Sequence, residues 1–153
     1  MINKNFNMIL KIKTSLALIL TVVILGISSC STISVFSPEA YKQAVDLKVE
    51  SLELMSFATM PYDDYQEEVA YLKTELSKAY EFSKGRPNNE ISTKQWEILI
   101  APDRNLLGGF LKRWEEEGTL SQMFVTEMQS LVGDAFDTII GLESGKIDPS
   151  EIK

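Results

Sequence analysis

Residues 62–83 read YDDYQEEVAYLKTELSKAYEFS and carry the clearest periodicity of the chain. Apolar or small side chains recur here at alternating steps of three and four residues: Tyr62, Tyr65, Val69, Leu72, Leu76, Ala79 and Ser83. Residues at these steps share one side of an α-helix, so the pattern predicts an amphipathic helix with one buried stripe. Gly85 is expected to end this helix.

A first helix is predicted on the N-terminal side of this stretch. Ser37, Pro38 and Glu39 have the features of an N-cap, a first helical position and an acidic first turn. The helix should run to about Met60 and stop before Pro61. Its apolar face is predicted to consist of Tyr41, Ala44, Val45, Leu52 and Met55, widened by Leu47, Leu54 and Ala58.

The third helical unit is predicted to be broken. Ser92 and Gln95 form the pattern of a capping box ahead of Trp96, and Pro102 interrupts the helix that follows. Asp103 is expected to cap a second piece, whose apolar band includes Leu106, Leu107, Phe110, Leu111 and Trp114. Gly108 and Gly109 lie inside that band; close packing is the preferred explanation and a flexible kink is the alternative.

A last helix is predicted from Ser121 to about Gly145, with a buried stripe of Phe124, Met128, Leu131, Ala135, Ile139 and Leu142. The fold class is therefore all-α. We expect a small antiparallel bundle of about four helices over residues 37–146, with the third one broken near Pro102. Residues 147–153 are expected to form a frayed tail.

The N-terminal region has the composition of a secretory signal. Residues 1–15 contain three lysines and no acid, and residues 16–27 read LALILTVVILGI. This apolar run is shorter than the roughly 18 residues expected of a membrane-spanning helix. The alternative is an uncleaved membrane anchor.

Residues 27–30, ISSC, resemble the lipobox of bacterial lipoproteins. The resemblance implies that residues 1–29 are a cleaved signal peptide and that Cys30 is the first residue of the mature chain. Its thiol would carry a diacylglycerol, with a further acyl chain on its amino group. Ser31 would favour the outer membrane, facing the periplasm, if the cell has two membranes. Residues 30–36 would form a short tether between this lipid and the bundle.

The charge balance limits the classes of partner. The leader holds three of the 15 basic residues and none of the 22 acidic ones, which leaves residues 30–153 with a formal net charge of −10. Nucleic acid is therefore not expected as a partner, because phosphate binding needs a basic face. The expected partners are the lipid bilayer, through the acyl anchor, and another protein of the envelope.

The residue types present limit the chemistry. The chain contains no histidine and a single cysteine, which excludes Ser-His-Asp triads, Cys-His pairs and histidine metal ligands. We predict a binding or structural module of the cell envelope that is not an enzyme and needs no metal or cofactor beyond the lipid. Two alternatives remain: a peptidoglycan-directed hydrolase that uses carboxylates, and a bundle that binds a small ligand beside Trp96 or Trp114.

The segment KGRPNNEISTKQW, residues 84–96, is the candidate binding region. Arg86, Asn88 and Asn89 could recognise peptide or sugar groups, and Trp96 could offer a stacking surface. The favoured alternative is structural, with the asparagines satisfying turn backbone and the indole filling the core. Carboxylates such as Asp46, Glu50, Glu53, Asp134 and Asp137 are expected to lie at the surface rather than to bind a metal.

Overall fold

Five α-helices and two short 3-10 helices make up residues 34–152, which are the part of the chain that the computed structural model describes. The predicted signal peptide, Cys30 and the first residues of the tether lie outside this part. The elements are α2 (Pro38–Ser56), η1 (Tyr62–Tyr65), α3 (Gln66–Lys84), α4 (Glu90–Ile100), α5 (Leu107–Glu117), α6 (Gln122–Glu143) and η2 (Pro149–Glu151).

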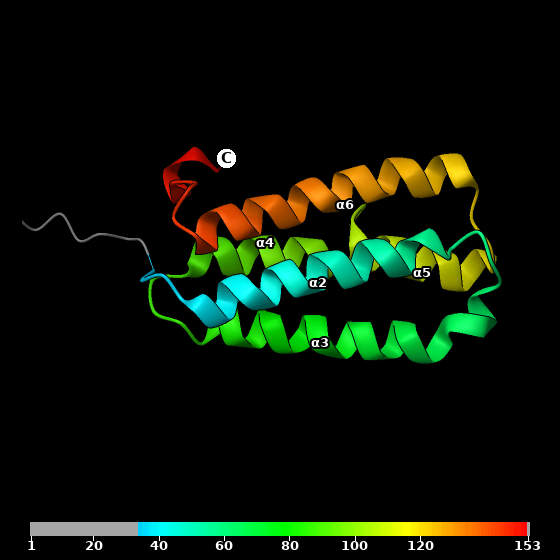
Figure 1. The fold of residues 1–153 in the computed structure, drawn as a ribbon, viewed down its shortest axis with the longest axis horizontal. Helices are drawn as coiled ribbons and strands as arrows, with labels where there is room; N and C mark the ends of the chain where they lie inside the picture. The colour runs from blue at the N-terminus through cyan, green and yellow to red at the C-terminus, as the bar shows by residue number, and fades with distance from the viewer. Residues whose placement is uncertain (1–33, 153) are drawn as a thin grey trace, which may run out of the picture. The chain divides into compact units, whose positions relative to one another are not determined.

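The helices form an antiparallel bundle, so the predicted all-α fold is confirmed (Figure 1). Helix α2 begins at the end that we call the tether end, where α3 ends, α4 begins and α6 ends. Helices α4 and α5 follow one another along the bundle and act as its third unit, interrupted at residues 101–106 as predicted. We call the opposite end, which holds η1, the far end.

The caps of the outer helices are confirmed, whereas those of the third unit are not. Ser37 Oγ accepts a hydrogen bond from the backbone N–H of Ala40 at 3.2 Å, and Ser121 Oγ accepts one from Phe124 at 3.3 Å. Helix α4, however, begins at Glu90, so Ser92 lies inside its first turn and caps nothing.

Two helix boundaries also differ from prediction. Leu106, and not Asp103, occupies the N-cap of α5, and no side chain makes a capping hydrogen bond there. Helix α2 ends at Ser56 rather than near Met60, because residues 57–60 form a turn that leads into η1. In this turn the carbonyl of Ala58 accepts a hydrogen bond from Leu120 N–H at 2.8 Å.

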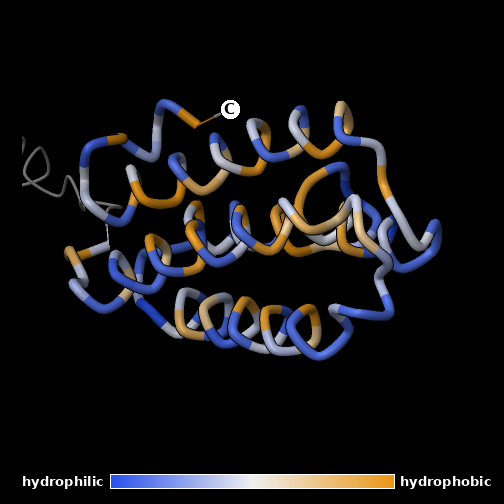
Figure 2. The backbone as a smooth tube through the Cα atoms, turned by 45° about the vertical axis from the view of Figure 1, so that its right-hand side comes forward, coloured by the Kyte–Doolittle hydropathy of each residue, from blue (hydrophilic) through white to orange (hydrophobic). Residues whose placement is uncertain are grey.

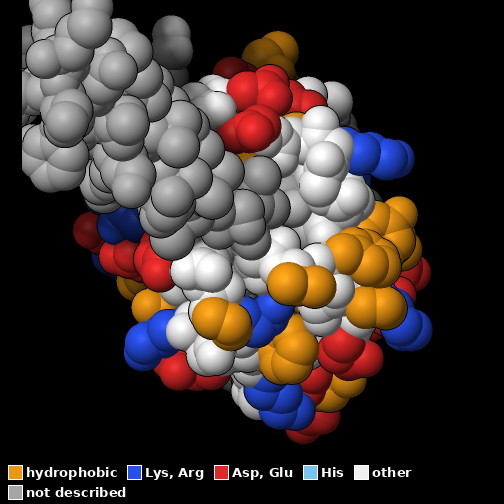
Figure 3. Space-filling view, turned by 90° about the vertical axis from the view of Figure 1, so that its left-hand side faces the viewer, with side chains coloured by type: hydrophobic (Ala, Val, Ile, Leu, Met, Phe, Trp, Pro, Cys, Tyr) orange, Lys and Arg blue, Asp and Glu red, His pale blue; other side chains and the backbone are white. Residues whose placement is uncertain are grey.

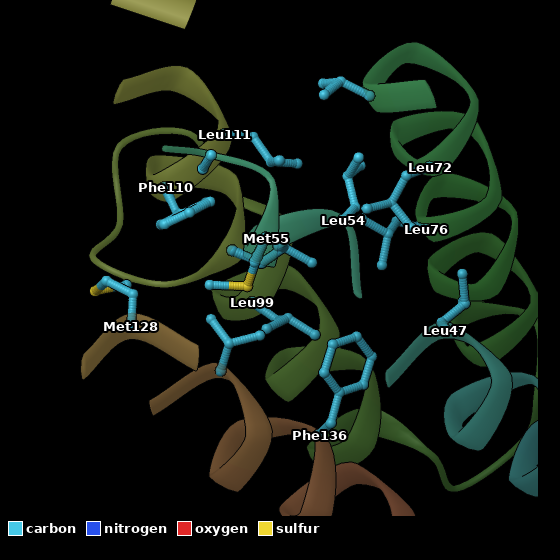
Figure 4. Close-up of a cluster of buried hydrophobic side chains, with 14 of the residues drawn as sticks. Leu47, Leu54, Met55, Leu72, Leu76, Leu99, Phe110, Leu111, Met128 and Phe136 are labelled. Carbon is cyan, nitrogen blue, oxygen red and sulfur yellow. The ribbon is translucent and has the colours of Figure 1, made fainter. Parts of the chain in front are cut away.

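The hydrophobic core runs along the centre of the bundle. The predicted stripe is confirmed along α3, where Val69, Leu72, Leu76, Ala79 and Ser83 are all buried, whereas Tyr62 and Tyr65 lie in η1 and are half-buried. Figure 2 shows apolar and polar segments alternating along each helix, as the amphipathic pattern requires. Figure 4 shows Met55, Leu99 and Phe136, from three different helices, meeting in the core. Trp114 is also fully buried, and its indole N–H donates to the carbonyl of Met60 at 3.0 Å.

The buried face of α6 is rotated from the predicted one. The buried side chains are Val125, Met128, Val132, Phe136 and Ile139, while Leu131 is 46% exposed. Hydrophobic residues occupy half of the positions of this helix, so spacing alone fits two different stripes. In α2, likewise, Tyr41 was predicted to lie in the core, but it is exposed at the surface.

The C-terminal tail is folded rather than frayed. The backbone N–H groups of Lys146 and Ile147 both donate to the carbonyl of Gly141, and the side chain of Ile147 packs directly on that glycine. Asp148 caps η2, and hydrogen bonds from the hydroxyl and backbone N–H of Ser150 lower the pKa of its carboxyl. This packing could not be predicted from the short polar sequence of the tail, because the packing depends on a contact with α6.

None of the helices in residues 34–152 has the length and hydropathy that crossing a bilayer requires.

Gly108 and Gly109 allow the backbone of α5 to approach the end of α4 and the loop that follows it. A Cβ at position 108 would overlap the carbonyl oxygen of Ile100, and one at position 109 would overlap that of Arg104. Close packing is therefore the correct explanation: Gly108 approaches the last residue of α4, and Gly109 approaches the connection between α4 and α5.

Gly109→Ala should lower the free energy of unfolding by about 1–3 kcal/mol, because the loop backbone must move to admit the methyl group. Gly133→Ala is the matched control within α6. There the new Cβ would lie 3.9 Å from Leu52 Cδ1, an ordinary contact, and should gain up to about 1 kcal/mol of helix propensity. Urea denaturation measures both; equal effects of the two changes would contradict this assignment.

The hydroxyl of Ser51 is fully buried in α2 and, within residues 34–152, has no hydrogen-bond partner. Ser51→Ala should therefore raise the free energy of unfolding by about 1 kcal/mol, since it removes an unpaired polar group and favours the helix. Ser77→Ala is the control, because the exposed Ser77 hydroxyl donates to the carbonyl of Lys73 at 2.8 Å. Thermal unfolding should show a clearly smaller gain for the control; a loss of stability in the Ser51 variant would refute the assignment.

Candidate functional site

A buried carboxylate organises the tether end of the bundle. Glu143 lies in the last turn of α6 and is 4% exposed. Its Oε1 accepts hydrogen bonds from Ser92 Oγ at 2.5 Å and Asn89 Nδ2 at 3.4 Å, and its Oε2 forms an ion pair with Arg86. The carboxylate thus joins the end of α6 to the connection between α3 and α4.

The guanidinium of Arg86 reaches in a second direction. Its Nη2 donates to Ser34 Oγ at 2.8 Å and to the carbonyl of Val35 at 2.7 Å. These residues precede α2 and belong to the predicted tether. Arg86 therefore binds the entering chain and the last turn of α6 at once, and we call the set of Ser34, Arg86, Asn89, Ser92 and Glu143 the Glu143 cluster.

Further hydrogen bonds satisfy the polar groups around the cluster. Asn89 Nδ2 also donates to the carbonyl and the hydroxyl of Ser83, at 3.1 and 2.8 Å. The hydroxyls of Ser83 and Thr93 lie 3.1 Å apart, and that of Thr93 donates to the carbonyl of Asn89 at 2.8 Å. A buried charge is tolerated only when it is paired and hydrogen-bonded, and this network meets that condition.

The predicted binding residues are placed in different environments. Arg86 and Asn89 lie in the Glu143 cluster, where Nη1 and Nη2 of Arg86 and Nδ2 of Asn89 already donate hydrogen bonds. Asn88 is exposed and has a positive φ of 55°, a conformation that asparagine tolerates in tight turns. Trp96 is 2% exposed and packs edge-on against Phe136, so its indole offers no surface for stacking.

Sequence reasoning missed Glu143, although the chain contains a signal for it. Val132, Phe136 and Ile139 define the buried face of α6, and Glu143 continues that face one turn later. An acid in phase with a buried stripe needs a buried partner. Once the buried stripe of α6 is known, Glu143 is expected to pair with a basic residue at the same end of the bundle, such as Arg86.

The remaining polar residues considered for chemistry lie at the surface. Asp137 is exposed and pairs with Lys48 at 2.6 Å, and Asp46 pairs with Lys42. In the described residues 34–152, no three acidic side chains gather in the way that a metal ion would require. The hollows beside the interruption of the third unit, of about 530 and 370 Å³, are open to solvent on either side of Pro102.

Comparisons with protein-family models, with curated proteins and with solved structures gave no match to this chain.

Glu143→Ala should lower the free energy of unfolding by about 3 kcal/mol or more, because it leaves the Arg86 guanidinium buried without its counter-charge. Arg86→Met combined with Glu143→Leu should recover much of this loss, since neither charge then remains. Urea denaturation of the full chain measures each free energy.

Glu97→Ala is the control for the Glu143 variant. Glu97 is exposed and pairs with Lys94 at 2.8 Å, so its loss should cost less than about 1 kcal/mol. A Glu143→Ala variant no less stable than the Glu97→Ala variant would show that the cluster carries little of the stability of the bundle.

Proposed function

We propose that this chain is a bacterial lipoprotein of the cell envelope, anchored through acyl chains on Cys30, whose helical domain is a non-catalytic binding and structural module. The observation that carries the proposal is the fixation of the tether by Arg86. A signal-like leader and the ISSC motif at residues 27–30 supply the anchor, and the Glu143 cluster supplies a defined connection from it to the bundle.

The connection is short. Only four peptide steps separate Cys30 from Ser34, a length of about 14 Å at most when fully extended. Since Arg86 holds Ser34 and Val35 against the bundle, acyl chains on Cys30 would keep the tether end close to the bilayer surface. A long flexible linker would instead let the domain tumble. The proposed anchor therefore limits how far the tether end can move from the membrane.

The surface of the tether end is consistent with a nearby bilayer. Several large apolar side chains are exposed there: Val35 and Phe36 in the tether, Phe82 in the last turn of α3, and Ile91 in the first turn of α4. Figure 3 views this end and shows hydrophobic side chains exposed among charged ones. Apolar side chains flanked by polar groups are suited to the headgroup boundary of a membrane.

The surroundings of Glu143, the most buried acid in residues 34–152, support a non-catalytic role. Glu143 accepts hydrogen bonds from three side chains and is held in an ion pair, an arrangement that fixes structure rather than leaving a carboxyl available to substrate. The proposed partners are the bilayer, reached through the lipid, and a protein of the envelope, with the outer membrane facing the periplasm as the proposed location in a cell with two membranes.

Cys30→Ala should abolish lipid labelling and leave the leader uncleaved, because the substituted residue has no thiol to acylate. Ser31→Ala should leave both labelling and cleavage intact, which makes it the matched control next to the same site. Metabolic labelling with a fatty-acid probe and mass spectrometry of the membrane fraction measure the outcome. An intact leader, or a first residue without acyl groups, in the unmodified chain would overturn the proposal.

A further inference from the structure

The seam between α2 and α3 contains a groove with an apolar floor and an acidic rim. Leu54 and Phe57 of α2 and Leu72 of α3 form the floor of this hollow of about 260 Å³. Carboxylates stand on both sides: Glu50 and Glu53 on α2, and Glu68 on α3. We call this feature the acidic groove.

No lysine or arginine of the described residues 34–152 forms a salt bridge with the carboxylates of the acidic groove. Within residues 34–152, Glu50, Glu53 and Glu68 form no salt bridge, whereas Asp46 and Glu75, further along the same seam, pair with Lys42 and Lys78. The sequence explains the difference. Residues 49–72 contain six acids and no lysine or arginine, and the flanking Lys48 and Lys73 pair with Asp137 and Glu115 instead.

An exposed aromatic residue stands in the acidic groove. Tyr71 of α3 is 62% exposed and lines both this hollow and a smaller one of about 110 Å³ that adjoins it along the seam. Tyrosine rings at a surface commonly anchor protein contacts, and their faces attract lysine and arginine side chains.

We propose that the acidic groove binds a segment of a partner protein in which an apolar side chain is flanked by lysine or arginine. The apolar side chain would occupy the floor over Leu54, Phe57 and Leu72, and the basic side chains would pair with the rim carboxylates and lie on Tyr71. This inference rests on the proposed function as a binding module and gives the chemical class of its partner.

Charge decides against other occupants. Anionic lipid and nucleic acid would be repelled by the rim, and so would a second copy of this acidic chain. A metal ion needs oxygens gathered around one point, but these carboxylates stand on two sides of an apolar floor. A basic amphipathic segment matches both the charge and the apolar surface.

The test measures peptide binding to the full chain in nanodiscs of neutral phosphatidylcholine, with protein-free nanodiscs as the blank. The probe is a fluorescent helical peptide with leucines on one face and lysines beside them. Two comparison peptides have either the leucines replaced by glutamine or the lysines replaced by glutamate. Fluorescence anisotropy should show binding of the first peptide, weakened by added salt, and at least about tenfold weaker binding of both others.

Variants of the chain locate the binding. Changing Glu50, Glu53 and Glu68 together to glutamine should lower the affinity for the first peptide about tenfold, since three charge contacts are lost. The control changes Asp103, Glu127 and Asp134 to their amides. These exposed acids lie outside the acidic groove, and the change in net charge is the same. The control should bind within about twofold of the unmodified chain, with circular dichroism confirming that both variants fold.

Equal weakening by both sets of changes, or no binding by the unmodified chain, would overturn the inference. Tyr71→Ala gives a second, charge-independent readout and should also reduce binding several-fold. The Cys30→Ala chain separates the two proposals, because it should bind the peptide with unchanged affinity. Absence of acyl groups from the unmodified chain would therefore refute the anchor alone, and absence of peptide binding would refute the acidic groove alone.

Discussion

The ion pair between Arg86 and Glu143 is the constraint on which the tether end depends. It connects three segments that are far apart in the sequence: the residues before α2, the connection from α3 to α4, and the last turn of α6. Placing two charges in the interior is costly unless every remaining hydrogen-bonding position is filled. Ser92, Asn89, Ser34 and the carbonyl of Val35 each form a hydrogen bond with one of the two charged groups, so the pair sets how these segments meet.

Sequence periodicity predicted most of the fold but little of this site. The stripe of α3 was identified correctly because its polar and apolar residues are cleanly separated, and the interruption at Pro102 follows from proline chemistry. The buried face of α6 was predicted incorrectly, because apolar residues surround much of that helix. Which of them are buried depends on the helices that α6 packs against. The Glu143 cluster joins side chains more than 50 residues apart, a relation that local patterns do not contain.

Arg86 and the acidic residues of α2 and α3 define the two surfaces that we propose for this domain. Arg86 looked like a binding residue, yet its guanidinium is used to hold the tether, which fixes the end nearest to the proposed lipid. The acids of α2 and α3 resemble an ordinary solvated face, yet three of them border an apolar groove and form no salt bridge within residues 34–152. In the proposed arrangement one end serves attachment, and the side of the bundle remains available to a partner.

Nuclear magnetic resonance of the arginine side chains tests the central claim most directly, because it reports whether Arg86 is held in solution. A guanidinium fixed between Glu143 and the tether should rotate slowly and give separate, exchange-protected Nη–H signals, which should be lost in a Glu143→Gln variant. The exposed Arg104 provides an averaged reference in the same spectrum. If the signals of Arg86 are averaged like those of Arg104, the ion pair does not organise the tether end.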